Sequence, residues 1–309
     1  MQAIQQLGIE FILFIQSFHS PALDQFFHAI TQFGGGAYLF LIPLVIWCFA
    51  PRLGLRAALA MLIAQFVVMV MKDYFGQPRP FQVDPRILSE GEWGLSFPSG
   101  HAQGAMVYYG LIAAVVARRS VTIALGLLIF LVGLSRPYLG VHYPHDVVAG
   151  WMIGAGLLYL WLSLEDSTAS FFRGLSVEKR GFLGVILPFG LAALHNFFFD
   201  NPSTYAIAGA VSGTIFCLAS PTVERWFDGS DRLWRKIARF ALGMPALFLL
   251  IQGMRYTWPA EPDATLALLT FINGAVMMLF IGLAAPRIFG WLRLAPSAQT
   301  RPERAAETH

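Results

Sequence analysis

Hydrophobic residues make up 56% of this 309-residue chain, and charged residues only 13%. A soluble fold could not cover so much apolar surface, and the composition also excludes a disordered chain, a collagen, a disulfide scaffold and a nucleic-acid-binding protein. The formal net charge of +3 is modest, so its meaning depends on where the charges lie. Because Cys48 and Cys217 both fall in apolar runs, we expect two buried, reduced thiols.

The first 32 residues are expected to form an amino-terminal interfacial segment. Residues 4–18 are short for a membrane span and carry several polar side chains, which is typical of an amphipathic helix lying in the membrane interface. No Lys or Arg precedes Arg52, so the segment also lacks the basic start of a signal peptide.

Apolar runs near the length needed to cross about 30 Å of hydrocarbon recur along the rest of the chain. They predict an all-α, polytopic membrane bundle of about nine transmembrane helices. The nine runs are residues 34–50, 54–73, 99–117, 121–139, 147–164, 181–199, 203–219, 240–257 and 265–285. We expect a core at 33–199, additional carboxy-terminal transmembrane helices at 200–292 and a cytoplasmic tail at 293–309.

The distribution of basic residues predicts the orientation of the bundle. Sixteen of the 21 Lys and Arg residues lie in the tail from Pro286 and in the connections 51–56, 118–120, 165–180 and 220–239. Positive charge marks the cytoplasmic side, so the amino terminus is expected outside and, after nine spans, the carboxyl terminus inside. The outer face then holds five cations, namely Lys72, Arg79, Arg86, Arg136 and Arg255.

The first outer loop begins at Lys72 and reaches Arg79 seven residues later, between Pro78 and Pro80. The two prolines stiffen the backbone. Lys offers a compact positive charge, and Arg can donate two parallel hydrogen bonds. Two such cations fixed on a short, rigid loop are well suited to bind an oxyanion.

The second outer loop ends in Ser99-Gly100-His101 and runs directly into the third predicted span. Ser99 is a natural N-cap, and Gly100 allows backbone amides to approach a ligand closely. Because the free N–H groups at a helix amino terminus attract anions, we expect His101 beside an anion site.

The third outer loop joins the fourth and fifth predicted spans. If Pro144 opens the fifth helix, His142 and Asp146 lie about one turn apart on one side of it. The carboxylate can then accept the proton on one ring nitrogen, which leaves the other nitrogen basic. Arg136 adds a third cation to the same face.

The three loops together resemble a known family. Their motifs are Lys72-x6-Arg79-Pro80, Pro98-Ser99-Gly100-His101 and Ser135-Arg136-x5-His142-x3-Asp146. These resemble the signatures of the type-2 phosphatidic acid phosphatase superfamily, which includes integral-membrane lipid phosphatases, glucose-6-phosphatase and the soluble vanadium haloperoxidases. Every motif position matches, whereas the spans after about Phe199 exceed the six that are usual in the family.

The resemblance implies a phosphatase and haloperoxidase-like helical core at 33–199 and a metal-independent reaction through a phosphohistidine, without a cofactor. In this scheme His142 is the nucleophile, Asp146 orients it, and His101 protonates the leaving group and then activates water. The implied phosphate ligands are Lys72, Arg79, Ser99, Gly100 and Arg136. The motifs contain no carboxylate cluster that would bind Mg²⁺.

Three functions stay open at the level of sequence. The first is hydrolysis, on the outer face, of a lipid phosphate such as phosphatidic acid, phosphatidylglycerol phosphate, a polyprenyl diphosphate or a sphingoid phosphate. In a bacterium this would be the periplasmic face of the inner membrane. The second is phosphotransfer to a hydroxyl acceptor, and the third is non-catalytic lipid or anion transport, which no internal repeat supports. The outer segment 76–97, with Arg86, Glu90, Glu92 and Trp93, is the best candidate for a lid or a head-group filter.

Overall fold

The computed structural model describes residues 2–220, 223, 232–256 and 265–295. All secondary structure in these residues is helical, which confirms the all-α prediction. Most of the predicted tail at 293–309, and most of the basic connection 220–239 before Arg232, lie outside the described residues.

The chain divides into two compact units. Unit 1 holds the residues up to Leu39 together with 60–180 and 193–204, and unit 2 holds 40–59, 181–192 and the described residues from Tyr205 onward. All of the predicted site residues belong to unit 1.

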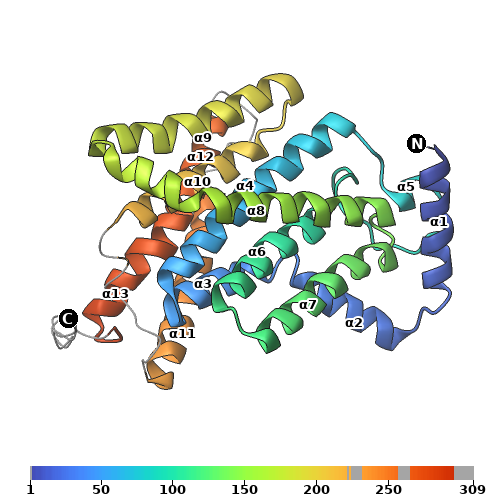
Figure 1. The fold of residues 1–309 in the computed structure, drawn as a ribbon, viewed down its shortest axis with the longest axis horizontal. Helices are drawn as coiled ribbons and strands as arrows, with labels where there is room; N and C mark the ends of the chain where they lie inside the picture. The colour runs from blue at the N-terminus through green and yellow to red at the C-terminus, as the bar shows by residue number, and fades with distance from the viewer. Residues whose placement is uncertain (1, 221–222, 224–231, 257–264, 296–309) are drawn as a thin grey trace. The chain divides into compact units, whose positions relative to one another are not determined.

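Unit 1 is built around one buried helix. Its elements are α1 (Gln2–Gln16), α2 (Pro21–Gln32), most of α4 (Pro51–Phe75), α5 (Pro80–Val83), α6 (Gly100–Val116), α7 (Arg119–Tyr138) and α8 (Pro144–Gly174). Helix α6 packs against both α7 and α8, and α7 also contacts α1 and α2 (Figure 1).

Glycines on α8 allow it to lie close to α6. A Cβ atom at Gly150 would come within 2.7 Å of the Ser99 carbonyl oxygen, and one at Gly154 within 2.9 Å of the Gln103 carbonyl oxygen. Small residues four positions apart on one helix are the usual means of close helix packing in membranes. The close approach places the beginning of α6 beside the beginning of α8.

Helix α1 joins the packed interior of unit 1. Its Ile9 and Ile12 are buried together with Ile87 and Tyr143. The Gln16 side chain at its end donates 2.8 Å hydrogen bonds to the carbonyl oxygens of Leu88 and Tyr138. The amino-terminal segment is therefore fixed to the loop that precedes α6 and to the end of α7, and its position in the membrane interface stays a prediction.

Unit 2 holds most of the remaining helices. They are most of α3 (Tyr38–Cys48), the middle of α9 (Val177–Phe199), most of α10 (Ser203–Ala219), α11 (Leu233–Arg255), α12 (Leu266–Leu279), the π-helical turn η2 (Phe280–Ala284) and α13 (Ala285–Trp291). The buried Trp47 donates a 2.8 Å hydrogen bond from Nε1 to the Ile281 carbonyl oxygen. Cys48 and Cys217 are buried and not joined, as expected.

Each of the nine predicted runs corresponds to a helix, but their lengths differ. Among the described residues, six helical stretches are long and apolar enough to cross a membrane: 51–83, 119–138, 144–172, 178–199, 233–255 and 266–291. Helices α3, α6 and α10 are shorter, with 11, 17 and 17 residues, so the count of nine spans is approximate. Three glycines at 34–36, which are poor helix formers, precede α3, so it begins later than the apolar run.

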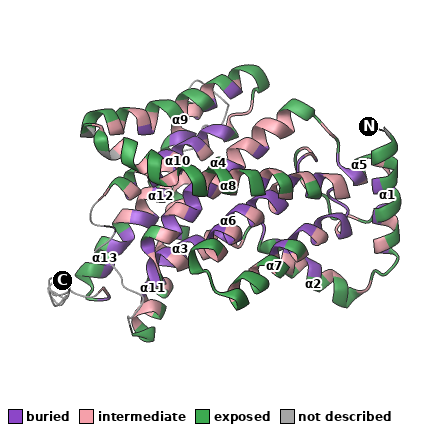
Figure 2. Cartoon of the chain, viewed as in Figure 1, coloured by how far each residue is buried: buried purple, intermediate pink, exposed green. Residues whose placement is uncertain are grey.

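Large apolar side chains cover much of the outer surface of α8. Met152, Tyr159 and Leu160 are all exposed, in contrast to the buried residues of α6 (Figure 2). Exposed apolar residues in such numbers are expected where a helix faces hydrocarbon rather than water.

Candidate active site

The three motif segments meet where α6 and α8 begin. The Ser99 backbone N–H donates a 3.0 Å hydrogen bond to the Asp146 carbonyl oxygen, which joins the second motif to the third. Arg79 Nη1 donates a 2.9 Å hydrogen bond to the Val141 carbonyl oxygen, which joins the first motif to the third. Lys72 Nζ donates to the carbonyl oxygens of Leu95 and Ser96 in the loop before α6.

The carboxylate of Asp146 is buried beneath His142. Pro144 occupies the first turn of α8, as expected, and this places His142 Nδ1 3.4 Å from Asp146 Oδ2. The same oxygen accepts hydrogen bonds from Ser96 Oγ at 2.5 Å and from the Tyr143 backbone N–H at 3.0 Å. A carboxylate held in this way fixes the orientation of the ring and favours the tautomer with the proton on Nδ1.

The other ring nitrogen of His142 faces a guanidinium group. His142 Nε2 lies 3.3 Å from Arg79 Nη1, and the His142 side chain is only 1% exposed. Burial, and next the positive charges of Arg136, Lys72 and Arg79, hold the pKa of His142 well below its usual range. The imidazole is therefore neutral at neutral pH, with an electron pair available on Nε2.

Two buried arginines converge on a single carboxylate. Arg79 and Arg136 are each 2% exposed, and Arg136 contacts Glu92 Oε2 while Arg79 Nη2 lies 3.4 Å from Glu92 Oε1. Arg136 Nη1 also donates a 2.5 Å hydrogen bond to Thr31 Oγ1 on α2. Because the two guanidinium groups meet around one oxyanion, they mark a place for a tetrahedral oxyanion of similar size.

His101 lies in the wall of a cavity of 830 Å³. The backbone at Gly35 lies directly against the His101 ring. A Cβ atom at this position would fall 2.6 Å from His101 Nε2, so there is no room for a side chain. His142 does not line the cavity, whereas Arg136 and Glu92 do. His101 therefore borders this cavity directly, and His142 does not.

Ser99 and Gly100 have local roles at the start of α6. Ser99 Oγ accepts a 3.4 Å hydrogen bond from the Ala102 backbone N–H, as expected of an N-cap. A Cβ atom at Gly100 would lie 3.3 Å from Val68 Cγ1 of α4. Binding of phosphate by these two residues stays a prediction, as do the phosphate-binding roles of Lys72, Arg79 and Arg136 and the catalytic roles of His101, His142 and Asp146.

The sequence pattern did not single out Ser96 or Thr31, although both contact site residues. Ser96 is fully buried and contacts Asp146, and Thr31 accepts from Arg136 across 105 positions of sequence. Nothing in the sequence distinguishes Ser96 from Ser89 in the same loop. Only its position two residues before the second motif could have drawn attention to it.

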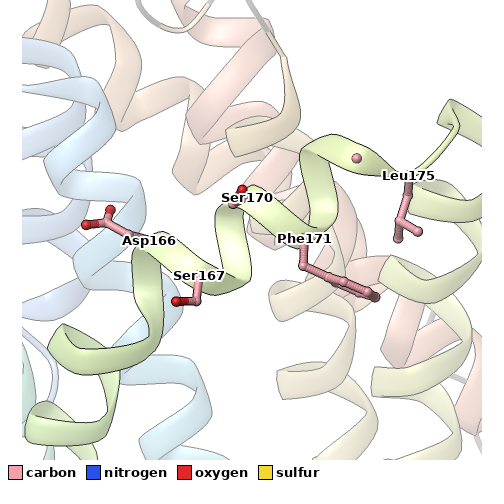
Figure 3. Close-up of a pocket in the computed structure, with 6 residues that line it drawn as sticks. Asp166, Ser167, Ser170, Phe171 and Leu175 are labelled. Atoms are coloured by element: carbon pink, nitrogen blue, oxygen red, sulfur yellow. The ribbon is translucent and has the colours of Figure 1, made fainter.

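Two other features lie outside this cluster. Asp73, at the end of α4, accepts a 2.8 Å hydrogen bond from Asn201 and lies 3.3 Å from His195 Nε2. A second pocket, of 680 Å³, is formed by the far end of α8 and the turn after it, with Asp166, Ser167, Ser170, Phe171 and Leu175 in its wall (Figure 3). In the described part of the chain, no group of three or more His, Cys, Asp or Glu residues is placed to hold a metal ion.

Two family models match this chain. Residues 53–168 match the PAP2 superfamily, and residues 205–297 match the PAP2 superfamily phosphatase, transmembrane extension. The first match contains all three motifs. Together with the helices of span length, the matches make this a multi-pass membrane protein.

Several curated proteins are similar to the chain. Phosphatidylglycerophosphatase B of Bacillus subtilis is 30% identical over 167 residues, which is 49% of this chain and 79% of that protein. Undecaprenyl-diphosphatase of Sulfolobus acidocaldarius is 34% identical over 119 residues, 38% of this chain and 57% of that protein. Sphingosine-1-phosphate phosphatase 1 of Rattus norvegicus is 27% identical over 163 residues, and the chain spans only 37% of its length.

Two solved structures are similar over about half of the chain. LpxE of Aquifex aeolicus has a TM-score of 0.47 and 28% identity, covering 51% of this chain and 95% of that one. The PAP2-type phosphatidylglycerolphosphate phosphatase of Bacillus subtilis has a TM-score of 0.48 and 25% identity, covering 54% of this chain and 88% of that one.

Proposed function

The chain belongs to the PAP2 superfamily, and on this premise we propose that it is an integral-membrane phosphatase that hydrolyses a phosphate ester of a membrane lipid through a phosphohistidine. One observation carries the proposal. His142 is held by Asp146 on one ring nitrogen and faces Arg79 with the other, beside a second buried arginine, Arg136. This is the arrangement that an imidazole nucleophile for an anionic phosphoryl group requires.

In the first step, His142 Nε2 attacks phosphorus in line with the leaving oxygen. A P–N bond forms as the P–O bond to the lipid breaks, and His101 donates its proton to the leaving alkoxide. Asp146, which faces Nδ1, stabilises the positive charge that develops on the ring. Lys72, Arg79 and Arg136 neutralise the phosphoryl oxygens.

In the second step, the phosphohistidine is hydrolysed. His101, now unprotonated, accepts a proton from water, and the oxygen of that water attacks phosphorus as the P–N bond breaks. Inorganic phosphate leaves, and both histidines return to their starting protonation states. The Ser99 hydroxyl and the Gly100 amide, at the start of α6, are the proposed further ligands of the phosphoryl oxygens.

The cations carry most of the proposed rate enhancement. Hydrolysis of a phosphate monoester is so slow in water that the site must lower the barrier by about 20 kcal/mol or more. One general acid contributes only about 10²–10⁴-fold. Fixed guanidinium groups, already buried before substrate binds, lose little energy in reorganising and therefore supply the larger share.

We place this site on the outer face of the membrane, which in a bacterium is the periplasmic face of the inner membrane. The support is the positive charge of the opposite connections. Cysteine substituted at Gly91 should react with a membrane-impermeant maleimide in intact spheroplasts, whereas cysteine at Arg118 should react only after lysis. The reverse pattern would invert the orientation.

The nucleophile is tested by trapping the intermediate. Enzyme incubated with ³²P-labelled lipid phosphate and quenched in alkaline detergent should carry label that is stable to alkali and lost in acid, as expected of a phosphohistidine. His142→Ala should abolish both label and turnover. The His101→Ala enzyme should accumulate label when the labelled substrate has a good leaving group, as p-nitrophenyl phosphate does.

Two controls separate the proposal from its alternatives. His195→Ala, which changes a histidine far from the motifs in sequence, should retain label. Phosphate release should not depend on an added alcohol, since dependence on an acceptor would identify a phosphotransferase instead. Full turnover by purified, folded His142→Ala enzyme would remove His142 as the nucleophile.

A further inference from the structure

The cavity beside His101 is bordered by the two amino-terminal helices. One face of α2 lines it through Pro21, Asp24, Gln25, His28, Thr31 and Gln32, which recur at spacings of three and four. The loop before α6 closes the other side through residues 88–92, and His101 and Arg136 lie where the cavity meets the catalytic cluster. His101, the proposed general acid, therefore borders this cavity.

The position of His101 determines which part of a substrate enters the cavity. The group that leaves with the protonated oxygen must lie next to the acid that protonates it. On the proposed function, on which this step rests, the cavity therefore holds the first atoms of the leaving alcohol. With a volume of 830 Å³, the cavity has room for a group much bulkier than the first methylene groups of an alkyl chain.

The wall of the cavity carries many polar side chains among apolar ones such as Leu88, Leu139 and Val141. His19, Gln25, His28 and Gln32 all lie in it, and amide and imidazole groups can both donate and accept hydrogen bonds. A hydrocarbon chain in this space would remove water from these groups and return no hydrogen bonds, which is unfavourable. The polar side chains of the wall therefore favour a leaving group that carries hydroxyls.

The carboxylates in the wall already have polar partners. Asp24 accepts hydrogen bonds from Tyr138 Oη at 2.7 Å and from His19 at 2.9 Å, and Glu90 lies 3.6 Å from His28. Glu92 contacts Arg136, as described above. A second phosphate would meet these carboxylates, and like charges at close range are unfavourable. A neutral, hydroxyl-rich group meets no such penalty.

We infer that the cavity binds a carbohydrate head group, so that the phosphate removed is the ester of a sugar hydroxyl on a lipid. When phosphate occupies the space between Arg79 and Arg136, the Glu92 carboxylate is freed to accept a hydrogen bond from a sugar hydroxyl. The amino-terminal helices then act as the specificity element of the enzyme, with Gln25 and Gln32 as hydrogen-bonding groups on α2.

A matched pair of substrates tests this inference on the full-length enzyme in detergent. Dodecyl glucoside 4-phosphate and dodecyl phosphate share one alkyl chain and differ by the sugar. We expect kcat/KM to be at least about tenfold higher for the glucoside phosphate, as a few hydrogen bonds to the sugar would give. Farnesyl diphosphate and sphingosine phosphate should be poorer than the glucoside phosphate.

Substitutions in the cavity wall test which residues produce the preference for the glucoside phosphate. Gln25→Leu combined with Gln32→Leu should bring the ratio of the two kcat/KM values close to one, chiefly through KM for the glucoside phosphate. Gln6→Leu, on α1 and outside the cavity wall, should keep the wild-type ratio. Equal or better hydrolysis of dodecyl phosphate, of the diphosphate or of sphingosine phosphate by wild-type enzyme would overturn the inference, as would a double variant that keeps the selectivity.

The outcome also separates this inference from the proposed function. If the enzyme forms the His142 phosphoenzyme but shows no preference for the sugar, only the carbohydrate site fails. If no phosphate ester is hydrolysed and no label forms, the proposed function fails, and the carbohydrate site with it.

Discussion

The Glu92 carboxylate lies 3.4 Å from Nη2 of the buried Arg79. It also contacts Arg136, so a side chain of the protein occupies the place where the two guanidinium groups converge. Glu92 is 33% exposed on the loop before α6, whereas both arginines are buried. If the two arginines bind phosphate as proposed, an entering phosphate must displace this carboxylate.

Replacement of Glu92 should strengthen phosphate binding. Glu92→Gln removes the competing charge while keeping a similar shape, so inorganic phosphate and orthovanadate should inhibit the variant about tenfold more tightly, equivalent to about 1.4 kcal/mol. The measurement is the competitive inhibition constant of each anion. Glu10→Gln on α1 is the matched control and should leave both constants unchanged. Weaker inhibition of Glu92→Gln would mean that Glu92 positions the arginines instead.

Ser96 should affect turnover through Asp146. Its hydroxyl donates a 2.5 Å hydrogen bond to Asp146 Oδ2 and lies 3.5 Å from His142 Nδ1. A hydrogen bond to a buried charge contributes about 1.5–3 kcal/mol, so Ser96→Ala should lower kcat by at least about tenfold, with a smaller change in KM.

Two further substitutions test whether the hydroxyl of Ser96 is responsible. Ser96→Thr keeps the hydroxyl and should restore part of the rate. Ser89→Ala, in the same loop, should have no effect on kcat. If Ser96→Thr were as slow as Ser96→Ala in enzyme that is folded and stable, packing rather than the hydrogen bond would explain the loss.

The motif residues could be predicted because their geometry is local. Pro144 fixes the start of α8, which sets the spacing of His142 and Asp146, and Ser99 caps α6 in the same way. The contacts made by Thr31 and Glu92 could not be predicted. They join segments 105 and 44 positions apart, and they depend on how α2 and the loop before α6 pack against α7.

The amino-terminal helices show a second limit of sequence patterns. The polar face of residues 4–18 predicts contact with water or lipid head groups, and periodicity alone does not reveal that Ile9 and Ile12 pack against Tyr143. Apolar length was likewise an imperfect guide to helix length. Helix α3 begins only after the three glycines at 34–36, and 11 residues of the run 34–50 are helical.

The acid limb of the pH profile should reflect His142. The pKa of His142 lies below its usual value because of burial first and then the charges of Arg136, Lys72 and Arg79. The neutral form of His142, the proposed nucleophile, therefore persists as pH falls below about 6.5, and activity should be lost only as pH falls through the lowered pKa. Lys72→Met removes one of the charges that depress the pKa, so the acid limb of kcat/KM should move to higher pH.

Comparison of the Lys72→Met and wild-type profiles separates the titration of His142 from that of the substrate. The substrate phosphate titrates identically in assays of both enzymes, so only the difference between the two profiles reports on His142. Glu10→Gln should reproduce the wild-type profile. An acid limb that moved to lower pH in Lys72→Met would contradict the assignment, because removal of a positive charge cannot make an imidazole harder to protonate.

The close packing of α6 on α8 should be sensitive to a single methyl group. A Cβ atom at Gly150 would fall 2.7 Å from the Ser99 carbonyl oxygen and 3.2 Å from Ala102 Cβ, so Gly150→Ala must push the two helices apart. Overpacking of this kind costs about 1–3 kcal/mol. The melting temperature in detergent should fall, and kcat should fall with it, because α6 carries Ser99, Gly100 and His101. Gly156→Ala on the same helix has nothing within 4 Å of its new methyl group and should change neither quantity. Equal melting temperatures for the two variants would show that α8 does not lie against α6 as closely as described.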